Sequence, residues 1–85
     1  MNAQKFGAIL RTIMVLNALK GEKGSYRLGE ISQWASMPRA TCDRQLRMMV
    51  ACNILVVCEK KYKGDFCRVF SISEAGEKLA EILKL

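Results

Sequence analysis

Arginine side chains recur at helical spacing near the middle of the chain. Apolar periodicity predicts a helix over about residues 38–52, with Arg39, Arg44 and Arg47 on its outward face. A guanidinium group donates two parallel hydrogen bonds, a fork that fits the O6 and N7 atoms of guanine and also a phosphate group. This face is therefore suited to nucleic acid, although residue type alone does not separate base contacts from backbone contacts.

Three more residues belong to the predicted contact set, namely Ala40, Thr41 and Asp43. Asp43 has two interpretations. It accepts a hydrogen bond from a cytosine amine, or it pairs with Arg39 or Arg47 and orients the guanidinium group; we favour orientation. The alternative for the whole face is that these are solvated charges on an ordinary exposed helix.

A second basic group falls in a predicted β-hairpin over residues 54–72. Ile54–Cys58 is a β-branched apolar run, Lys61–Asp65 is a polar tract with a glycine, and Phe66–Ile72 alternates in part. The basic residues of this segment are Lys60, Lys61, Lys63 and Arg68. We expect them to lie against neighbouring phosphates or in a minor groove, with Tyr62 able to pack on a sugar. A lysine-rich tip is also a common guard against edge aggregation.

An amphipathic helix is predicted from Ala3 to Lys20. Its apolar residues recur at steps of three and four, which indicates a buried face. They are Phe6, Ile9, Leu10, Ile13, Leu16 and Leu19. Met14 and Val15 widen the stripe, so the helix is a candidate for a dimer contact as well as for the core. The tract Gly21–Ser25 is expected to end it.

A short second helix is predicted with Leu28, Ile31 and Ala35 on its inner face. Pro38 suits the first turn of the next helix, because its missing N–H would have no helical partner there. The inner positions of that helix are Cys42, Leu46, Met49 and Val50. Asn53 is expected to form a left-handed cap at its end.

A final helix is predicted after the hairpin, with Ser73 as its cap and Glu74 near the positive end of its dipole. Its expected inner side consists of Ala75, Leu79, Ile82 and Leu83. The predicted order is therefore three helices, a hairpin and a helix, a mainly α, α+β architecture in one domain over residues 1–85.

Composition excludes several classes of function. The net charge of +6 favours a polyanionic partner without identifying one. With no histidine and no phosphate-binding glycine loop, we expect no catalytic site, metal site or cofactor. No run approaches the roughly 20 apolar residues that span a bilayer, and no export signal is evident, so the expected location is the cytoplasm.

The four cysteines are Cys42, Cys52, Cys58 and Cys67. They contain no C-x-x-C pair, which argues against a metal site. We interpret them as reduced thiols that act as small apolar core residues, with a redox-sensing thiol as the alternative.

Two segments resemble known regulators. Leu28–Leu46, with Leu-Gly-Glu-Ile in the short helix and Met-Pro-Arg-Ala-Thr at the start of the next, resembles the helix-turn-helix of IclR-type regulators. The hairpin followed by Phe70–Gly76 resembles the wing and following helix start of MarR-type regulators. The chain departs from the usual pattern by carrying Ser36 and Asn53 where these families commonly have glycine. The resemblance implies a winged helix-turn-helix fold and binding to double-stranded DNA.

The sequence thus predicts a small DNA-binding transcription regulator whose 38–52 helix enters the major groove. We expect a homodimer through the first and last helices, motivated by Met14, Val15, Ile82 and Leu85, on a palindromic site. The chain length leaves no room for a ligand-binding domain. The alternative function is a protein-interaction module, with Trp34 either packed or part of a partner surface.

Overall fold

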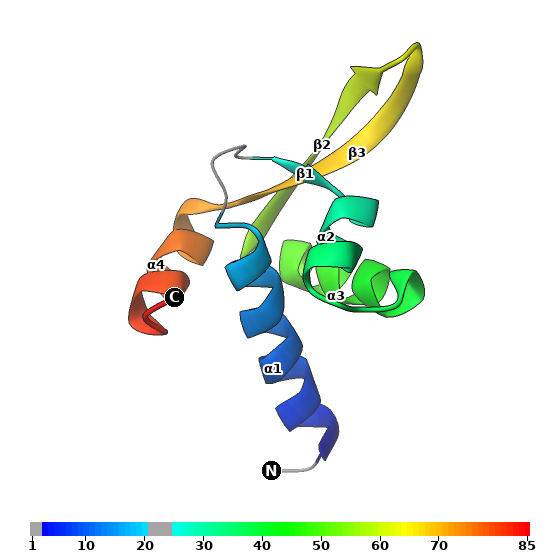
Figure 1. Cartoon of the computed structure of the whole chain (residues 1–85). Coiled ribbons are helices and arrows are strands. Elements are labelled where there is room, and N and C mark those ends of the chain that lie inside the picture. The colour runs from blue at the N-terminus through cyan, green and yellow to red at the C-terminus, as the bar shows by residue number, and fades with distance from the viewer. Residues whose placement is uncertain (1–2, 21–24) are drawn as a thin grey trace.

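The computed structural model describes residues 3–20 and 25–85, with side chains from residue 7 onward except at Tyr62. The predicted helix break over residues 21–24 and the side chains of Phe6 and Tyr62 lie outside the described part. The described elements follow one another along the chain as shown in Figure 1. They are α1 (Ala3–Ala18), β1 (Tyr26–Arg27), α2 (Leu28–Trp34), α3 (Arg39–Ala51), β2 (Leu55–Tyr62), β3 (Asp65–Ile72) and α4 (Glu74–Ile82).

A tight turn joins α2 to α3. Ser36 adopts the left-handed conformation with φ of 55°, a geometry that glycine adopts most readily. The Ser32 hydroxyl donates a hydrogen bond to the Met37 carbonyl oxygen at 2.6 Å, and the Met37 N–H donates to the Ser32 carbonyl oxygen at 3.0 Å. Pro38 is the N-cap of α3, one position before the predicted first turn. These bonds fix the angle between α2 and α3.

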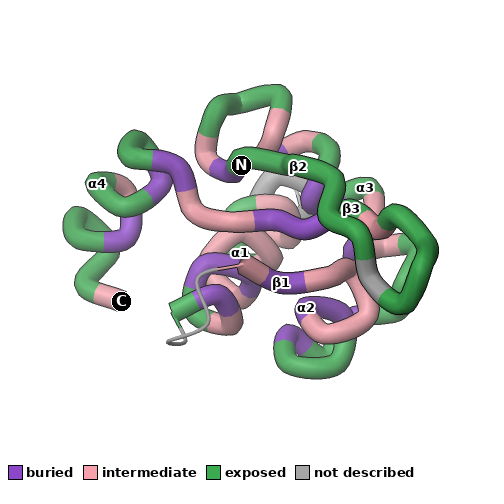
Figure 2. The backbone as a smooth tube through the Cα atoms, turned by 90° about the horizontal axis from the view of Figure 1, so that it is seen from above, coloured by how far each residue is buried: buried purple, intermediate pink, exposed green. Residues whose placement is uncertain are grey.

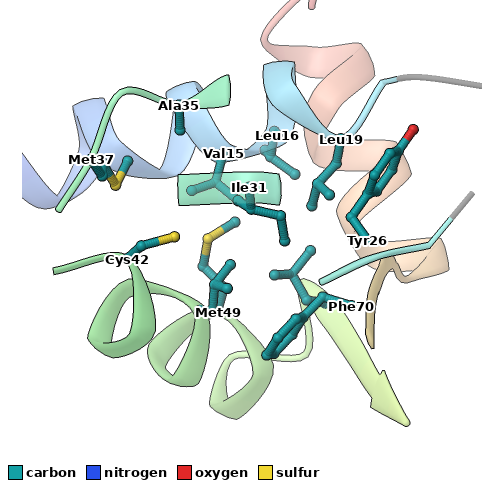
Figure 3. Packing of buried hydrophobic residues seen from close by; sticks show 12 residues of the cluster. Val15, Leu16, Leu19, Tyr26, Ile31, Ala35, Met37, Cys42, Met49 and Phe70 are labelled. Carbon is teal, nitrogen blue, oxygen red and sulfur yellow. The ribbon is translucent and has the colours of Figure 1, made fainter. Parts of the chain in front are cut away.

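The hydrophobic core lies where α1, α2 and α3 meet the base of the sheet (Figure 3). Its members are Val15, Leu16, Leu19, Tyr26, Ile31, Ala35, Met37, Cys42, Leu46, Met49, Leu55 and Phe70. The predicted inner positions of α3 are confirmed, with Cys42, Leu46 and Met49 fully buried and Val50 partly buried. This burial holds α3 with its opposite face toward solvent.

The predicted buried face of α1 is wrong in its first half. Ile9 and Leu10 are 49% and 47% exposed, whereas Val15 and Leu16 are fully buried. Figure 1 shows the reason, because the N-terminal end of α1 projects beyond the other elements. An apolar stripe is buried only where another element covers it.

The sequence did not reveal β1. Its two residues pair antiparallel with β3, Tyr26 opposite Phe70 and Arg27 opposite Val69, giving the sheet order β1-β3-β2 within the described residues. A two-residue strand is too short for a period of two to be recognised.

The hairpin is tighter than predicted. Lys61 pairs with Phe66 and Tyr62 pairs with Asp65, so only Lys63 and Gly64 form the turn. Their φ values of 51° and 87° are both positive, as in a type I′ turn, whose twist matches that of the strands. The predicted polar loop over Lys61–Asp65 is therefore mostly strand.

The start of α4 is confirmed, but of its predicted inner face only Leu79 packs against the core. Gly76 and Ala80 are buried, whereas Ala75 is exposed, Ile82 is 76% exposed and Leu83 is 38% exposed. The helix approaches the start of the hairpin so closely that a Cβ on Gly76 would overlap the Ile54 carbonyl oxygen. Such close packing selects small residues at the contact and leaves Ile82 and Leu83 outside.

Ser73→Ala is expected to lower the free energy of unfolding by about 1–2 kcal/mol. The Ser73 hydroxyl accepts a hydrogen bond from the Gly76 N–H at 2.9 Å and donates one to the Asn53 carbonyl oxygen at 2.6 Å. Urea unfolding followed by circular dichroism measures the loss. Ser71→Ala is the control, because the Ser71 side chain makes no hydrogen bond to the described residues. Equal losses in the two variants would contradict the capping role.

The interpretation of all four cysteines as core residues is wrong for two of them. Cys42 is buried, Cys67 is partly buried, and Cys52 and Cys58 are exposed. Cys52 is the C-cap of α3 and Cys58 lies on β2 of the wing, positions that the core does not reach. Burial, with a smaller contribution from the Asp43 carboxylate, raises the pKa of the Cys42 thiol above its ordinary value of 9.0.

Thiol labelling is expected to separate exposed cysteines from the buried one by their reaction rates. Cys52 and Cys58 should react with an aromatic disulfide reagent at the rate of exposed thiols, whereas Cys42 should react only as the protein unfolds, because its thiolate is disfavoured and enclosed. Mass spectrometry after increasing labelling times measures this, with the denatured protein as the reference for complete labelling. Rapid labelling of Cys42 in the folded protein would contradict the packing of α3.

Candidate nucleic-acid interface

The exposed face of α3 carries the three predicted arginines. Arg39, Arg44 and Arg47 are all exposed, as is Ala40, while Thr41 and Asp43 are partly buried. The helix is anchored from behind by Cys42, Leu46 and Met49. The structure therefore gathers the predicted residues of α3 on the outer surface of a rigidly packed helix.

Asp43 forms an ion pair with one of its two predicted partners. Its Oδ2 atom lies 3.1 Å from Nε of Arg47, one helical turn further along α3. Exposed pairs at this spacing contribute only about 0.3–0.5 kcal/mol to stability. The main effect of the pair is to restrict the direction of the Arg47 side chain.

A cleft of about 670 Å³ separates the helix-turn-helix from the wing. Its lining residues come from β1, α2, α3 and β3 and include Arg27, Glu30, Arg39, Asp43 and Arg68. Arg39 and Arg68 thus approach the cleft from α3 and β3, two elements far apart in the sequence. Both carboxylates of the lining are paired, Asp43 with Arg47 and Glu30 with Arg27.

Arg27 was not identified from the sequence. Its backbone N–H donates a hydrogen bond to Oε1 of Glu30 at 3.0 Å, and its Nε atom lies 3.5 Å from the same oxygen. This arrangement caps the start of α2 and holds Arg27 at the mouth of the cleft. An arginine followed three residues later by glutamate before a helix was the available signal.

The basic residues of the wing lie on different faces. The outer half of the hairpin is exposed (Figure 2). Strand alternation places Arg68 and Lys61 on the sheet face that also carries Val57 and Phe70. A smaller hollow beside α3 is lined by Arg68, Val57 and Phe70 together with Arg47 of α3. Lys60 lies on the other face, where its Nζ atom donates to the Ser25 hydroxyl at 3.3 Å, and Lys63 lies in the turn. The structure brings Arg68 beside α3, places Lys61 on the same face nearer the hairpin tip, and separates Lys60 from both.

Other kinds of site find little support in the described part of the chain. Within residues 3–20 and 25–85, no three cysteine, aspartate or glutamate side chains cluster closely enough to hold a metal ion. None of the described helices has the length and apolar character needed to cross a membrane.

A helix-turn-helix, a three-stranded sheet ending in a basic hairpin, and arginines on the outer face of α3 define a winged helix-turn-helix domain. The IclR helix-turn-helix domain model matches residues 8–57, which include α2, α3 and most of α1. The chain belongs to this family, and its class is that of DNA-binding transcription regulators. No curated protein matches the sequence.

Solved structures show the same fold at low sequence identity. A PadR family transcription regulator from Clostridium difficile R20291 has a TM-score of 0.76 and 18% identity, over 87% of this chain and 82% of its own. A MarR family regulator from Silicibacter pomeroyi has a TM-score of 0.72 and 15% identity, over 87% of this chain but only 46% of its own. TubR from Bacillus thuringiensis serovar israelensis, bound to 24 bp of tubC, has a TM-score of 0.71 and 15% identity, over 96% and 87%.

Proposed function

We propose that the chain regulates transcription by binding double-stranded DNA with α3 in the major groove and the hairpin on the adjacent backbone or minor groove. The observation that carries this proposal is the placement of Arg39, Arg44 and Arg47 on the exposed face of a helix whose other face is buried. A B-DNA major groove is about 12 Å wide and admits one helix. Binding by a protein of the same fold, TubR on tubC, supports the proposal.

The contact set in this proposal consists of Arg39, Ala40, Thr41, Asp43, Arg44 and Arg47 on α3 and of Lys60, Lys61, Lys63 and Arg68 on the wing. Asp43 acts through Arg47, because the ion pair directs that guanidinium group. Arg68 and Lys61 reach backbone phosphates beside α3, because they share the strand face that borders it. A protein that acts on chromosomal DNA would be located in the cytoplasm, with the nucleoid.

The groove assignment is tested by chemical protection. A preferred sequence is first selected from a random duplex pool, and the bound duplex is then treated with a reagent that methylates guanine N7, an atom of the major groove. The proposal predicts protection of guanines in two half-sites about one helical turn apart. Unchanged N7 reactivity on tightly bound DNA would exclude α3 from the major groove.

We further propose a homodimer through the first and last helices, on a palindromic site. Of the four residues that motivated this dimer in the sequence, only Ile82 is exposed. Val15 is fully buried, and Met14 and Leu85 pack against the core. Among the described side chains of these two helices, the exposed large apolar residues are Ile9 and Leu10 on α1 and Ile82 and Leu83 at the end of α4. A second copy would remove them from water.

Sedimentation of the protein at micromolar concentration is expected to give the mass of two chains, and Ile82→Glu is expected to give the mass of one. The glutamate charge would be unfavourable in an apolar interface, whereas an exposed side chain tolerates it. Lys78→Glu is the control on the same helix. A single-chain mass for the unmodified protein would contradict the dimer and leave DNA binding by α3 untouched.

One observation favours the alternative of a protein-interaction module. Trp34 is 50% exposed, with its ring packed edge-on against Tyr26 at a centroid distance of 5.0 Å. Half-exposed tryptophan is frequent in protein interfaces. Under this alternative Trp34→Ala abolishes the regulatory activity of the protein in cells and Arg44→Glu leaves it unchanged. The DNA-binding proposal predicts the reverse.

A further inference from the structure

A second basic groove lies between α1 and α3, on the far side of α3 from the wing cleft. Its volume is about 520 Å³, and its lining residues are Ala8, Arg11, Thr41, Arg44, Gln45 and Met48. Both charged residues of this lining are arginines, one from each helix. The groove therefore has a positive potential without a carboxylate in its walls.

Arg11 reaches this groove from α1, where Gly7 leaves room for its side chain. A Cβ placed on Gly7 would lie only 3.1 Å from the Nη1 atom of Arg11, which shows that the guanidinium group lies back along the helix over Gly7. Among the described residues, neither Arg11 nor Arg44 forms an ion pair with a carboxylate. Two guanidinium groups on one groove without a counter-charge provide a site for an external anion.

The floor of the groove fixes the two helices relative to each other. Gln45 is only 5% exposed, and its Nε2 atom donates a hydrogen bond to the Thr12 hydroxyl at 2.9 Å. That hydroxyl in turn donates to the Ala8 carbonyl oxygen at 2.9 Å. Because a buried amide without a partner is costly, this connection stabilises one relative position of α1 and α3. The backbone positions that carry Arg11 and Arg44 are thereby fixed relative to each other.

We propose that this groove binds a backbone phosphate of the DNA whose major groove receives α3, with Arg11 and Arg44 as its ligands. This inference rests on the proposed function. Base edges lie at the floor of the major groove, where only α3 reaches, whereas phosphates line its rim, where a neighbouring helix meets them. Arg44 is thus a backbone ligand, and the reading of bases is left to Arg39 and Arg47. The helix α1 becomes a second DNA-binding element.

The test is the salt dependence of binding to two random-sequence duplexes, followed by fluorescence anisotropy. Each phosphate contact contributes about 0.9 to the slope of log affinity against log salt concentration, which is roughly a fivefold effect on affinity at about 0.15 M salt. Arg11→Gln is expected to make this slope shallower by about 0.9 and to weaken binding roughly fivefold on both duplexes. Lys20→Gln, which removes the same charge two residues after the end of α1, is expected to change neither.

Arg11→Lys is the second variant, and it should keep the slope while binding more weakly than the unmodified protein, because an ammonium group retains the charge but not the fork. Equal slopes and affinities for Arg11→Gln and Lys20→Gln would overturn the phosphate site while leaving the proposed function intact. A loss on one duplex but not the other would also overturn it, since it would indicate base reading. No binding by the unmodified protein would instead overturn the proposed function itself.

Discussion

The Arg44→Glu, Arg47→Glu double variant is expected to bind its selected duplex at least about 30-fold more weakly than the unmodified protein. Loss of a phosphate contact at Arg44 weakens binding roughly fivefold, and loss of a base contact at Arg47 costs roughly 1–3 kcal/mol. Both side chains are exposed on the outer face of α3, so their loss leaves the core intact. Replacing Arg47 also removes the partner of Asp43 and places a second carboxylate next to it. Anisotropy titration at about 0.1 M salt measures the change.

The matched control is the Lys20→Glu, Lys78→Glu double variant, which changes the net charge equally. Lys78 is exposed on α4, which lies on the opposite side of α1 from α3 (Figure 1). Lys20 lines a hollow with residues of α4, so both charges lie on that side of the molecule. This control should bind within about threefold of the unmodified protein, because salt screens exposed charges over a Debye length of roughly 10 Å. Equal losses in the two double variants would show that total charge, and not the face of α3, governs binding.

Gly76→Ala is expected to lower the free energy of unfolding by about 3 kcal/mol, at the upper end of the range for overpacking. The added Cβ would overlap the Ile54 carbonyl oxygen and lie 2.8 Å from Cγ2 of Ile72. The obstacle is backbone, which has to move together with the start of the hairpin. For a domain of this size the loss corresponds to a fall in melting temperature of about 12–24 °C.

Gly29→Ala is the matched control for this substitution. A Cβ on Gly29 would meet only the Nη2 atom of Arg39 at 3.9 Å, an ordinary van der Waals distance. Because alanine favours the helix over glycine by up to about 1 kcal/mol, this variant should be as stable as the unmodified protein or more so. A melting temperature for Gly76→Ala within a few degrees of that of Gly29→Ala would contradict the close approach of α4 to the hairpin.

Elements with strong local signals were predictable from the sequence. The apolar spacing of Cys42, Leu46 and Met49 defined the inner face of α3, and with it the outward face of the arginines. Ser73 and Asn53 marked helix boundaries through side-chain capping and left-handed geometry, both of which depend on one or two residues. The order of helices and hairpin followed from such signals.

Tertiary contacts determine which of the apolar helix faces are buried, and the sequence does not predict these contacts. The apolar side of α4 looked like a buried face, but the close approach at Gly76 turns Ile82 to solvent. The first half of α1 is equally apolar, yet no other described element covers Ile9 and Leu10. Whether an amphipathic helix face is buried depends on how far the neighbouring elements extend along it. The periodicity of the apolar residues carries no information about those neighbours.

The candidate site also combines residues that the sequence predicts with residues that it does not. The arginines of α3 were predictable because they share one helix, whereas Arg27 and Arg11 join the surface only through folding. Arg11 interrupts an apolar helix and lies far from α3 in sequence. The hairpin lysines were treated as one group, but strand alternation places Lys60 and Lys61 on opposite faces.

The most direct test of double-stranded DNA binding is titration of the unmodified protein with a random-sequence duplex at two salt concentrations. We predict tight binding at low salt and a steep fall in affinity at the higher salt concentration. The reason is that the lysine and arginine side chains of the protein release condensed counterions from the DNA phosphates when they bind. Circular dichroism on the same sample confirms that the protein is folded. Absence of binding at low salt by the folded protein would contradict the account and direct attention to a protein partner.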